Sequence, residues 1–489
     1  MTMFMERIRD LLQLEFENHT LVKDSENILE ESKMCSEINR LGFTIHEYND
    51  VEDFRFLFES KIKVDRHNKY LIVVRTEIYI PYDILQFFNV WELSYSSIFP
   101  KLDSYTLKRG KHLDLNLISI AYGDLYGERL SEKETNDFIS NTIYKNEYKE
   151  EYIKFIDNRI RDLLDELESY KQWFEIAELK ATRNIMAIGL DGNYKHTERR
   201  MAENFKEFLL KNYGKLSGIT GFDGPVLVSK VLDYLLMKND KIALIVMDGM
   251  SISDWQIIKK SIEPDFELRF SFAMLPTITA ISRQSLLSGK LPIAHKKPFT
   301  LANEKNQFIA KANEIIKDSE TINYYRGYDF EISYKDRFIC TIINDIDDLV
   351  HSQLMGISGH FEDIRRMSGT GRLNDLINRL LGQGFEVYIT SDHGNTEATG
   401  MGRPKGMGVE VETKSQRMLI LKDYASVDTL KGEFRLSEHP SYYLPKEFSY
   451  FVCEDGTALG KKGDVIMSHG GTSIEEVIVP FIKIKGDNR

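Results

Sequence analysis

Four short apolar runs in the second half of the chain, each ending in polar residues, constrain the fold more than any other feature. They read IALIVMDG (242–249), ICTIIND (339–345), EVYITSDHG (386–394) and RMLILKD (417–423). Such runs are typical of strands that are buried on both faces, as in parallel sheets. Helical patterns such as GRLNDLINRLLGQG (371–384) lie between them. The alternation predicts an α/β fold in which helices sandwich a largely parallel sheet.

The first part of the chain, residues 1–125, has a weaker pattern of the same kind. Apolar residues at helical spacing predict a helix over residues 5–40. The segments GFTIHEYND (42–50) and YLIVVRT (70–76) then read as strands, with a helical stretch between them. We therefore expect a small N-terminal α/β domain.

The middle of the chain, residues 126–215, is highly charged and keeps apolar residues at helical spacing. This combination predicts a helical connector between two domains. Residues 216–489 then form the third part, an α/β catalytic domain. A chain of 489 residues has room for about two to four domains, so a division into three is reasonable.

Charge, cysteine content and hydropathy exclude several classes of protein. The formal net charge of −12 argues against a molecule that binds nucleic acid over its whole surface, although a local basic patch stays possible. Cys35, Cys340 and Cys453 are far apart and odd in number, which suits a reducing compartment. No apolar run approaches the length of a membrane span, and the N-terminal segment lacks the pattern of a signal peptide. We therefore expect a cytoplasmic protein.

The polar residues at the strand ends are the first candidates for a functional site, because ligands bind beyond the carboxyl ends of the strands in open α/β sheets. Asp248 follows one run directly, and Asp392 with His393 follows another. Asp347 and His351 are four residues apart, so on a helix they share a face. His469 lies in SHGGTS, just before a strand-like segment. Three carboxylates and three histidines are suitable ligands for two divalent metals that assist phosphoryl transfer, whereas the alternative is a set of turn formers and helix caps.

A candidate nucleophile lies in AMLPTITAISRQSLLSG (273–289), which is rich in hydroxyl groups and reads as the start of a helix. These hydroxyl groups belong to Thr277, Thr279, Ser282, Ser285 and Ser288. The N-terminus of a helix favours a phosphate, and a nearby metal would lower the pKa of a hydroxyl group there.

The order of these motifs resembles the alkaline phosphatase superfamily. Within it, VMDGMS (246–251), the hydroxyl-rich segment, NDIDDLVH (344–351) and YITSDHG (388–394) most resemble the PglZ domain. The PTxT pattern that ends at Thr279 is also similar to that of nucleotide pyrophosphatase/phosphodiesterases. A sulfatase would require a cysteine in place of Thr279, although Arg283 keeps the spacing of the sulfatase arginine.

The resemblance implies which residues bind metal. One ion would be held by Asp248, Thr279, Asp392 and His393, and the other by Asp347, His351 and His469. The metal implied is zinc, with manganese also compatible with carboxylate and imidazole ligands. Asp345 and Asp348 are alternatives to Asp347. By the same resemblance Thr279 attacks phosphorus and forms a phosphothreonine intermediate, with Thr277 as the second candidate.

The resemblance further implies a metal-dependent phosphodiesterase that acts on nucleotide or oligonucleotide substrates, in bacteriophage defence of the BREX type and with protein partners from such a system. A phosphomonoesterase and a non-catalytic PglZ scaffold in a defence complex are the alternatives. Basic residues near the motifs are candidate contacts to substrate phosphates: Lys290, Lys296, Lys297, Arg403 and Lys405. We expect no membrane partner.

Overall fold

The structure is a computed structural model of the 489-residue chain. It describes residues 3–31, 34–65, 67–190, 195–221, 223–237, 241–403, 409–410, 415–422 and 434–486. The contacts divide the chain into two compact units, Met1–Arg159 and Ile160–Arg489. Among the helices in the described ranges, none is both long and apolar enough to cross a membrane.

The first unit contains a four-stranded parallel sheet in the order β2-β3-β1-β4. Its strands are β1 (His19–Lys23), β2 (Phe43–Glu47), β3 (Lys69–Val74) and β4 (Asn89–Glu92). The helices before and between them are α1 (Met3–Leu11), α2 (Ile28–Glu31), α3 (Met34–Arg40), α4 (Val51–Leu57) with the π-helical turn Phe58–Ile62, and α5 (Tyr82–Leu85). The predicted strands at 42–50 and 70–76 are confirmed. The predicted helix over 5–40 is confirmed at α1, α2 and α3 but is not continuous, because β1 interrupts it and pairs with both β3 and β4.

Four short helices and one long helix, α10, follow this sheet and lead into the second unit. They are α6 (Tyr95–Ile98), α7 (Ser104–Arg109), α8 (Leu115–Gly123), α9 (Glu132–Ser140) and α10 (Asn146–Asp165). The boundary between the two units falls within α10.

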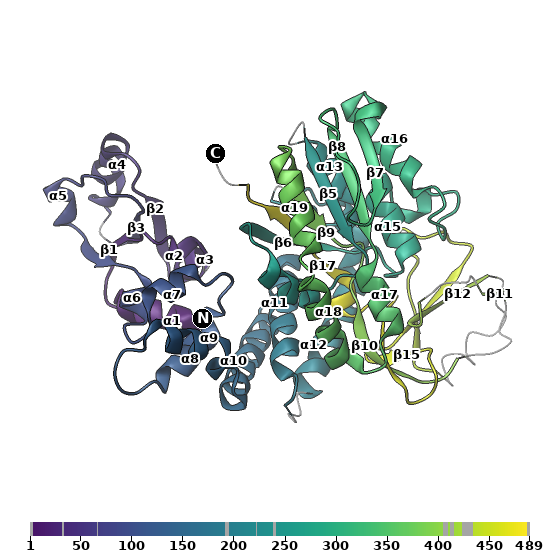
Figure 1. The fold of residues 1–489 in the computed structure, drawn as a ribbon, viewed down its shortest axis with the longest axis horizontal. Coiled ribbons are helices and arrows are strands. Elements are labelled where there is room, and N and C mark those ends of the chain that lie inside the picture. Colours follow the sequence, from purple (N-terminus) through teal and green to yellow (C-terminus); the bar gives the residue numbers. More distant parts are fainter. Residues whose placement is uncertain are drawn as a thin grey trace. The chain divides into compact units, whose positions relative to one another are not determined.

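The second unit is built on a six-stranded sheet in the order β6-β17-β9-β5-β8-β7 (Figure 1). Its strands are β5 (Ile242–Met247), β6 (Phe266–Phe272), β7 (Ile322–Arg326), β8 (Phe338–Ile343), β9 (Glu386–Thr390) and β17 (Ile478–Ile484). Strands β9, β5, β8 and β7 pair in parallel, and β17 is antiparallel to both of its neighbours, β6 and β9. The predicted α/β fold with a largely parallel sheet is therefore confirmed.

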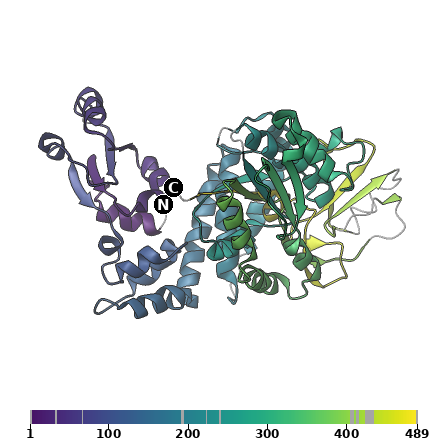
Figure 2. The same cartoon turned by 45° about the horizontal axis from the view of Figure 1, so that its top comes forward.

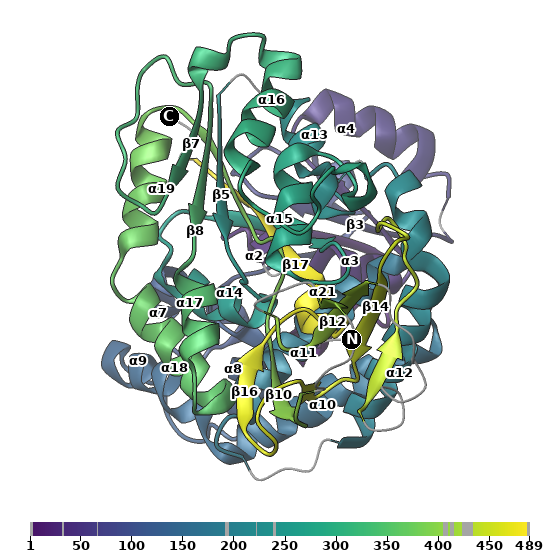
Figure 3. The same ribbon diagram turned by 90° about the vertical axis from the view of Figure 1, so that its right-hand side faces the viewer.

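Helices cover both faces of this sheet, as the view in Figure 3 shows. One face packs against α13 (Val231–Leu236), α15 (Thr279–Ser288) and α16 (Glu304–Ile316). The other packs against α14 (Ile252–Ile258), α18 (Gly356–Ser368) and α19 (Arg372–Gly382). Strand β5 is apolar at every position because Leu244 and Val246 face the first layer while Ile245 and Met247 face the second.

Two long helices, α11 (Tyr170–Ala187) and α12 (Lys195–Asn212), belong to the same unit. Phe174 of α11 and Phe208 of α12 pack on Phe272 of β6, with ring centroids 5.0 and 5.8 Å from it. Lys180 of α11 is buried, and its Nζ lies 2.9 Å from both a Glu198 and a Glu475 carboxylate oxygen. These helices therefore support the edge of the sheet and the short helix α21 (Ile474–Val477).

Two smaller sheets complete the unit and lie beside the central one, in yellow-green in Figure 2. One has the order β11-β12-β14-β13 and the other β15-β10-β16. Their strands are β10 (Thr396–Gly400), β11 (Val409–Glu410), β12 (Met418–Lys422), β13 (Leu436–Glu438), β14 (Ser449–Cys453), β15 (Thr457–Ala458) and β16 (Val465–Ser468). The apolar run at 417–423 thus forms β12 of an antiparallel sheet and does not join the parallel one.

Candidate active site

The carboxyl ends of the central strands carry the residues of the site. Asp248 comes directly after β5, where Gly249 turns the chain with a φ of +75°, a conformation that glycine adopts without strain. Asp392 and His393 follow β9 by two and three residues. Asp347 lies on α17 (Asp345–Ser352), which begins two residues after β8. All of these strands are parallel neighbours, so their ends meet at one edge of the sheet.

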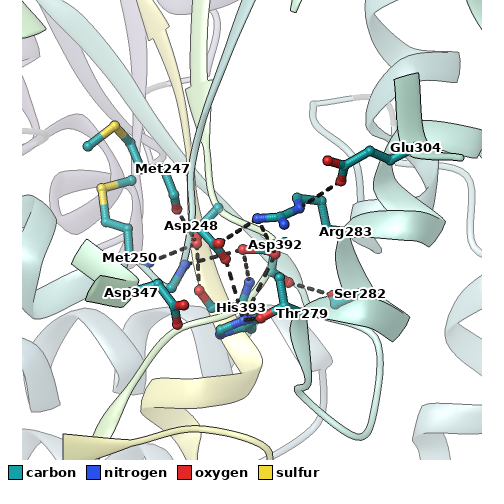
Figure 4. Close-up of polar contacts among 12 residues, drawn as sticks. Met247, Asp248, Met250, Thr279, Ser282, Arg283, Glu304, Asp347, Asp392 and His393 are labelled. Atoms are coloured by element: carbon teal, nitrogen blue, oxygen red, sulfur yellow. Dashed lines mark hydrogen bonds and ion pairs between the residues drawn. The ribbon is translucent and has the colours of Figure 1, made fainter. Parts of the chain in front are cut away.

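Asp248, Asp392 and His393 form one group, which we call the Asp248 cluster (Figure 4). His393 Nε2 lies 3.7 Å from Asp248 Oδ1 and 3.9 Å from Asp392 Oδ2. Both of these carboxylate oxygens are buried and accept no hydrogen bond from the described residues. His393 Nδ1 lies 3.0 Å from the carbonyl of Gly394 and donates to it, which leaves the lone pair of Nε2 facing the two carboxylates. Unpaired buried acceptors of this kind fit a bound cation.

Asp347, His351 and His469 form a second group, the Asp347 cluster. Asp347 Oδ1 lies 3.4 Å from His351 Nε2 and 3.5 Å from His469 Nε2, and it too lacks a hydrogen-bond donor within the described ranges. His469 Nδ1 donates to the carbonyl of Thr277 at 3.0 Å, so its Nε2 faces the cluster. This second set of donors also fits a divalent cation. The ring of His469 stacks on that of His393, so the two clusters are adjacent.

The electrostatics of the two clusters differ. Burial, reinforced by the nearby Asp392 carboxylate, raises the pKa of Asp248 well above its usual value. Burial acts in the same direction on Asp347, but the nearby His351 and His469 imidazoles favour its ionised form and hold the pKa of Asp347 below its usual value. Burial and the neighbouring His393 lower the pKa of His469 to about 3, so this imidazole is neutral at pH 7 and available as a ligand.

Arg283 is a buried cation within the Asp248 cluster. Its Nη1 contacts Asp248 Oδ2 directly and lies 4.0 Å from Asp392 Oδ2, while its Nε donates to Glu304 at 3.0 Å (Figure 4). Glu304 is buried as well and also accepts from Tyr324 Oη (2.7 Å) and Arg326. Arg283 is thus held between Glu304 and the carboxylates of the cluster, where it offsets part of their mutual repulsion.

The two threonines of the PTxT motif have different surroundings. Thr279 is the first residue of α15 and partly exposed, and its Oγ1 lies 2.9 Å from His393 Nε2. Thr277 is fully buried, and its Oγ1 donates to the carbonyl of Gly471 at 2.8 Å and accepts from Gly470 N at 3.1 Å. Thr279 therefore faces the Asp248 cluster, and Thr277 fixes the loop that carries His469.

The remaining predicted residues lie outside the clusters. Asp345 accepts a hydrogen bond from Tyr328 Oη at 3.1 Å, and Asp348 is exposed, so Asp347 is the carboxylate that the structure brings to the two histidines. The basic residues Lys290, Lys296, Lys297 and Arg403 are exposed, and Lys405 is outside the described residues.

Several residues that contact the clusters or their loops were missed at the level of sequence. Glu304 follows a segment without a clear periodic pattern, so nothing in the sequence connects it to Arg283. The position of Arg283 near the site could be inferred from the sequence, because Arg283 is four residues from Thr279 and therefore on the same helical face. Asp254 is the N3 residue of a capping box that starts at Ser251, and this motif can be recognised in the sequence. Its contacts with distant segments depend on the tertiary structure and could not be recognised.

Comparison with known proteins places these residues in a known family. A family model described as the BREX system PglZ alkaline phosphatase-like domain matches residues 227–484, which contain both clusters and Thr279. A search of curated proteins gave no match.

Solved structures of murine and human ectonucleotide pyrophosphatase/phosphodiesterase 5 are distant matches. An inactive murine variant in complex with AMP is 10% identical with a TM-score of 0.36, over 50% of this chain and 88% of that chain. The murine protein (11%, TM-score 0.34) and the human protein (12%, TM-score 0.35) each match 50% of this chain and 87% of their own. Similarity at this level does not indicate a substrate.

Proposed function

Because the chain belongs to the PglZ family of BREX-system alkaline phosphatase-like domains, we propose that it is a metal-dependent phosphodiesterase with Thr279 as its nucleophile. One observation carries the proposal. The partly exposed Thr279 hydroxyl lies 2.9 Å from His393 Nε2, at the edge of two adjacent groups of metal-ligand residues, all of them buried except the exposed His351. A scaffold has no need for these unpaired acceptors, which destabilise the protein in the absence of a cation.

The residues have separate roles in the proposed reaction. Asp248, Asp392, His393 and Thr279 would hold one divalent ion, and Asp347, His351 and His469 the other. The ligand set favours zinc and also accepts manganese. When bound, the ions would lower the pKa of the Thr279 hydroxyl and stabilise negative charge on the phosphoryl oxygens.

Thr279 Oγ loses its proton to solvent and forms a bond to phosphorus, while the bond from phosphorus to one ester oxygen breaks and that oxygen leaves as an alcohol after taking up a proton. Attack by water on phosphorus then breaks the bond to Thr279 Oγ, which releases a phosphomonoester and restores the hydroxyl group. The position of Thr279 at the N-terminus of α15 favours a phosphoryl group beside it, because this end of a helix carries a partial positive charge.

We expect nucleotide or oligonucleotide phosphodiesters to be the substrates, in a defence system of the BREX type. The test is turnover of bis(p-nitrophenyl) phosphate by the purified full chain, beside p-nitrophenyl phosphate as the monoester. Chelator should abolish turnover and zinc or manganese should restore it. Faster hydrolysis of the monoester would identify a phosphomonoesterase instead, and absence of both activities in the metal-loaded protein would favour the scaffold.

A further inference from the structure

A buried polar network lies behind the Asp248 cluster and contains none of the proposed metal ligands. Its centre is the carboxylate of Asp254 on α14, which is completely buried. Asp254 Oδ2 accepts hydrogen bonds from Ser251 N (2.9 Å), Ser251 Oγ (2.8 Å) and Asn395 Nδ2 (2.6 Å). Asp254 therefore fixes the chain on both sides of the Asp248 cluster, just after Asp248 and just after His393.

Asn395 links these two loops directly. The same Nδ2 group that donates to Asp254 also donates to the carbonyl of Gly249 at 2.8 Å. The loops are in close contact here, because a Cβ atom at Gly394 would lie only 3.2 Å from Ser251 Cα. The relative positions of Asp248 and His393 consequently depend on the hydrogen bonds around Asp254.

The other oxygen of Asp254 connects this region to a third element. His360 of α18 is completely buried, and its Nε2 lies 2.8 Å from Asp254 Oδ1. Helix α18 follows α17 after only a short turn and packs against it, and α17 carries Asp347 and His351. The contact between Asp254 and His360 thus joins the loops of one cluster to the helices of the other.

The surroundings of His360 indicate that its contact with Asp254 does something other than stabilise the fold. Its neighbours on α18, Phe361 and Ile364, belong to the hydrophobic core, so an apolar side chain would suit the position. His360 Nδ1 is buried and has no hydrogen-bond partner among the described residues, which is unfavourable. Buried polar pairs often contribute less to stability than apolar residues of the same size, and some are retained because they specify one arrangement.

We propose that Asp254 and His360 are positioning residues that hold the two metal clusters at a fixed separation. The inference rests on the proposed function, since it requires that the clusters bind metal. Replacing a residue that orients metal ligands without binding the metal itself typically lowers metal affinity by about 10–100-fold.

The experiment compares His360→Gln with His360→Asn in the full chain. Glutamine can extend an N–H donor toward Asp254 as histidine does, whereas asparagine is one methylene shorter and leaves the carboxylate without this donor. Cobalt(II) is titrated by calorimetry, and its visible absorption spectrum reports the ligand geometry. His439→Gln is the control, because His439 is a buried histidine in the same unit that lies in neither cluster.

We expect the wild type, His360→Gln and the control to bind two equivalents with similar spectra. His360→Asn should bind at least one equivalent about 10–100-fold more weakly, with an altered spectrum, while circular dichroism shows that it is folded. Equal affinities and spectra for the two His360 variants would overturn the positioning role and leave the proposed function intact. Failure of the wild type to bind cobalt, zinc or manganese would overturn both.

Discussion

The imidazole rings of His393 and His469 are stacked, with centroids 4.2 Å apart and planes inclined by 16°. One ring belongs to the Asp248 cluster and the other to the Asp347 cluster, and each is fixed by a hydrogen bond from Nδ1 to a backbone carbonyl. A displacement of either ring therefore affects both clusters. The two proposed metal sites are thus adjacent, as two-metal catalysis of phosphoryl transfer would require.

Replacing Thr279 by alanine should lower phosphodiesterase activity by at least about 10³-fold, because it removes the hydroxyl group that is proposed to form the covalent intermediate. Metal content should stay near that of the wild type, since the remaining ligands are unchanged. Turnover of bis(p-nitrophenyl) phosphate measures the loss of activity, and metal analysis measures the metal content. Thr279→Ser should keep measurable activity. Near-wild-type turnover by Thr279→Ala, with an inactive Thr277→Ala, would show that the other hydroxyl is the nucleophile.

Asp392→Ala and His469→Ala should each abolish activity and lower the metal content below two equivalents, because each removes one ligand of a different cluster. The measurement is metal content by mass spectrometry beside turnover. Asp348→Ala is the matched control: this carboxylate is exposed on the same helix as Asp347, and its loss should leave both quantities unchanged. Chelator-resistant turnover, or full metal content in both variants, would contradict the two-metal proposal.

Arg283→Met should destabilise the metal-free protein by about 3–5 kcal/mol, because it leaves the buried Asp248 and Glu304 carboxylates without their shared cation. Added zinc should then raise the melting temperature more in the variant than in the wild type, since the metal supplies the missing positive charge. Arg326→Met is the control, because Arg326 is half exposed and its loss leaves Glu304 paired with the buried Arg283, so the destabilisation should be smaller. Equal zinc shifts in wild type and Arg283→Met would refute this interpretation of Arg283.

His439 should make the protein more sensitive to acid. It is buried, and burial lowers its pKa to about 4 from an ordinary value of 6.5. The unfolded chain therefore binds a proton that the folded chain excludes, so this contribution is complete above pH 6.5. It is lost as pH falls from 6.5 through 4, by roughly 3 kcal/mol in total. Urea unfolding at pH 7 and pH 4 should show a smaller loss of stability for His439→Leu than for wild type. Equal losses of stability in His439→Leu and wild type would mean that burial does not lower the pKa of His439.

The division of the chain into an N-terminal α/β domain, a helical connector and a catalytic domain stays a prediction that two fragments can test. Residues 146–489 keep α10, α11 and α12, whereas residues 216–489 lose all three. The shorter fragment should aggregate, because it exposes Phe272 of β6, and a large buried aromatic residue contributes about 3–5 kcal/mol. Size-exclusion chromatography and turnover compare the two fragments. A monomeric, active 216–489 fragment would show that these helices serve something other than the catalytic sheet.

The candidate ligands could be selected from the sequence because each lies at a position that local rules define. Apolar runs precede Asp248, Asp392 and His393. Parallel pairing of such strands is enough to bring their carboxyl ends to one edge of the sheet. Asp347 could be preferred to its neighbours because it alone is four residues from His351, a spacing that places both side chains on one helical face.

Other features depend on contacts between distant segments and could not be predicted. Strand β1 is only five residues long and follows a helical pattern, so its pairing with β3 and β4 was not visible. Glu304 and His360 gain their roles from partners that are 21 and 106 residues away, respectively. The run at 417–423 is as apolar as a parallel strand, and only its antiparallel pairing with β14 shows that it belongs to another sheet.

The position of β17, one strand in from the edge of the six-stranded sheet, affects the order in which the site can be completed. This strand fills the place between β6 and β9, and Glu476, just before it, accepts a hydrogen bond from Gly471 N at 2.7 Å in the loop of His469. The sheet is therefore incomplete until the ribosome has made the chain through residue 484, although earlier segments can fold before that point. Assembly of the Asp347 cluster therefore depends on a late segment of the chain, because the loop that carries His469 is anchored to the residues just before β17.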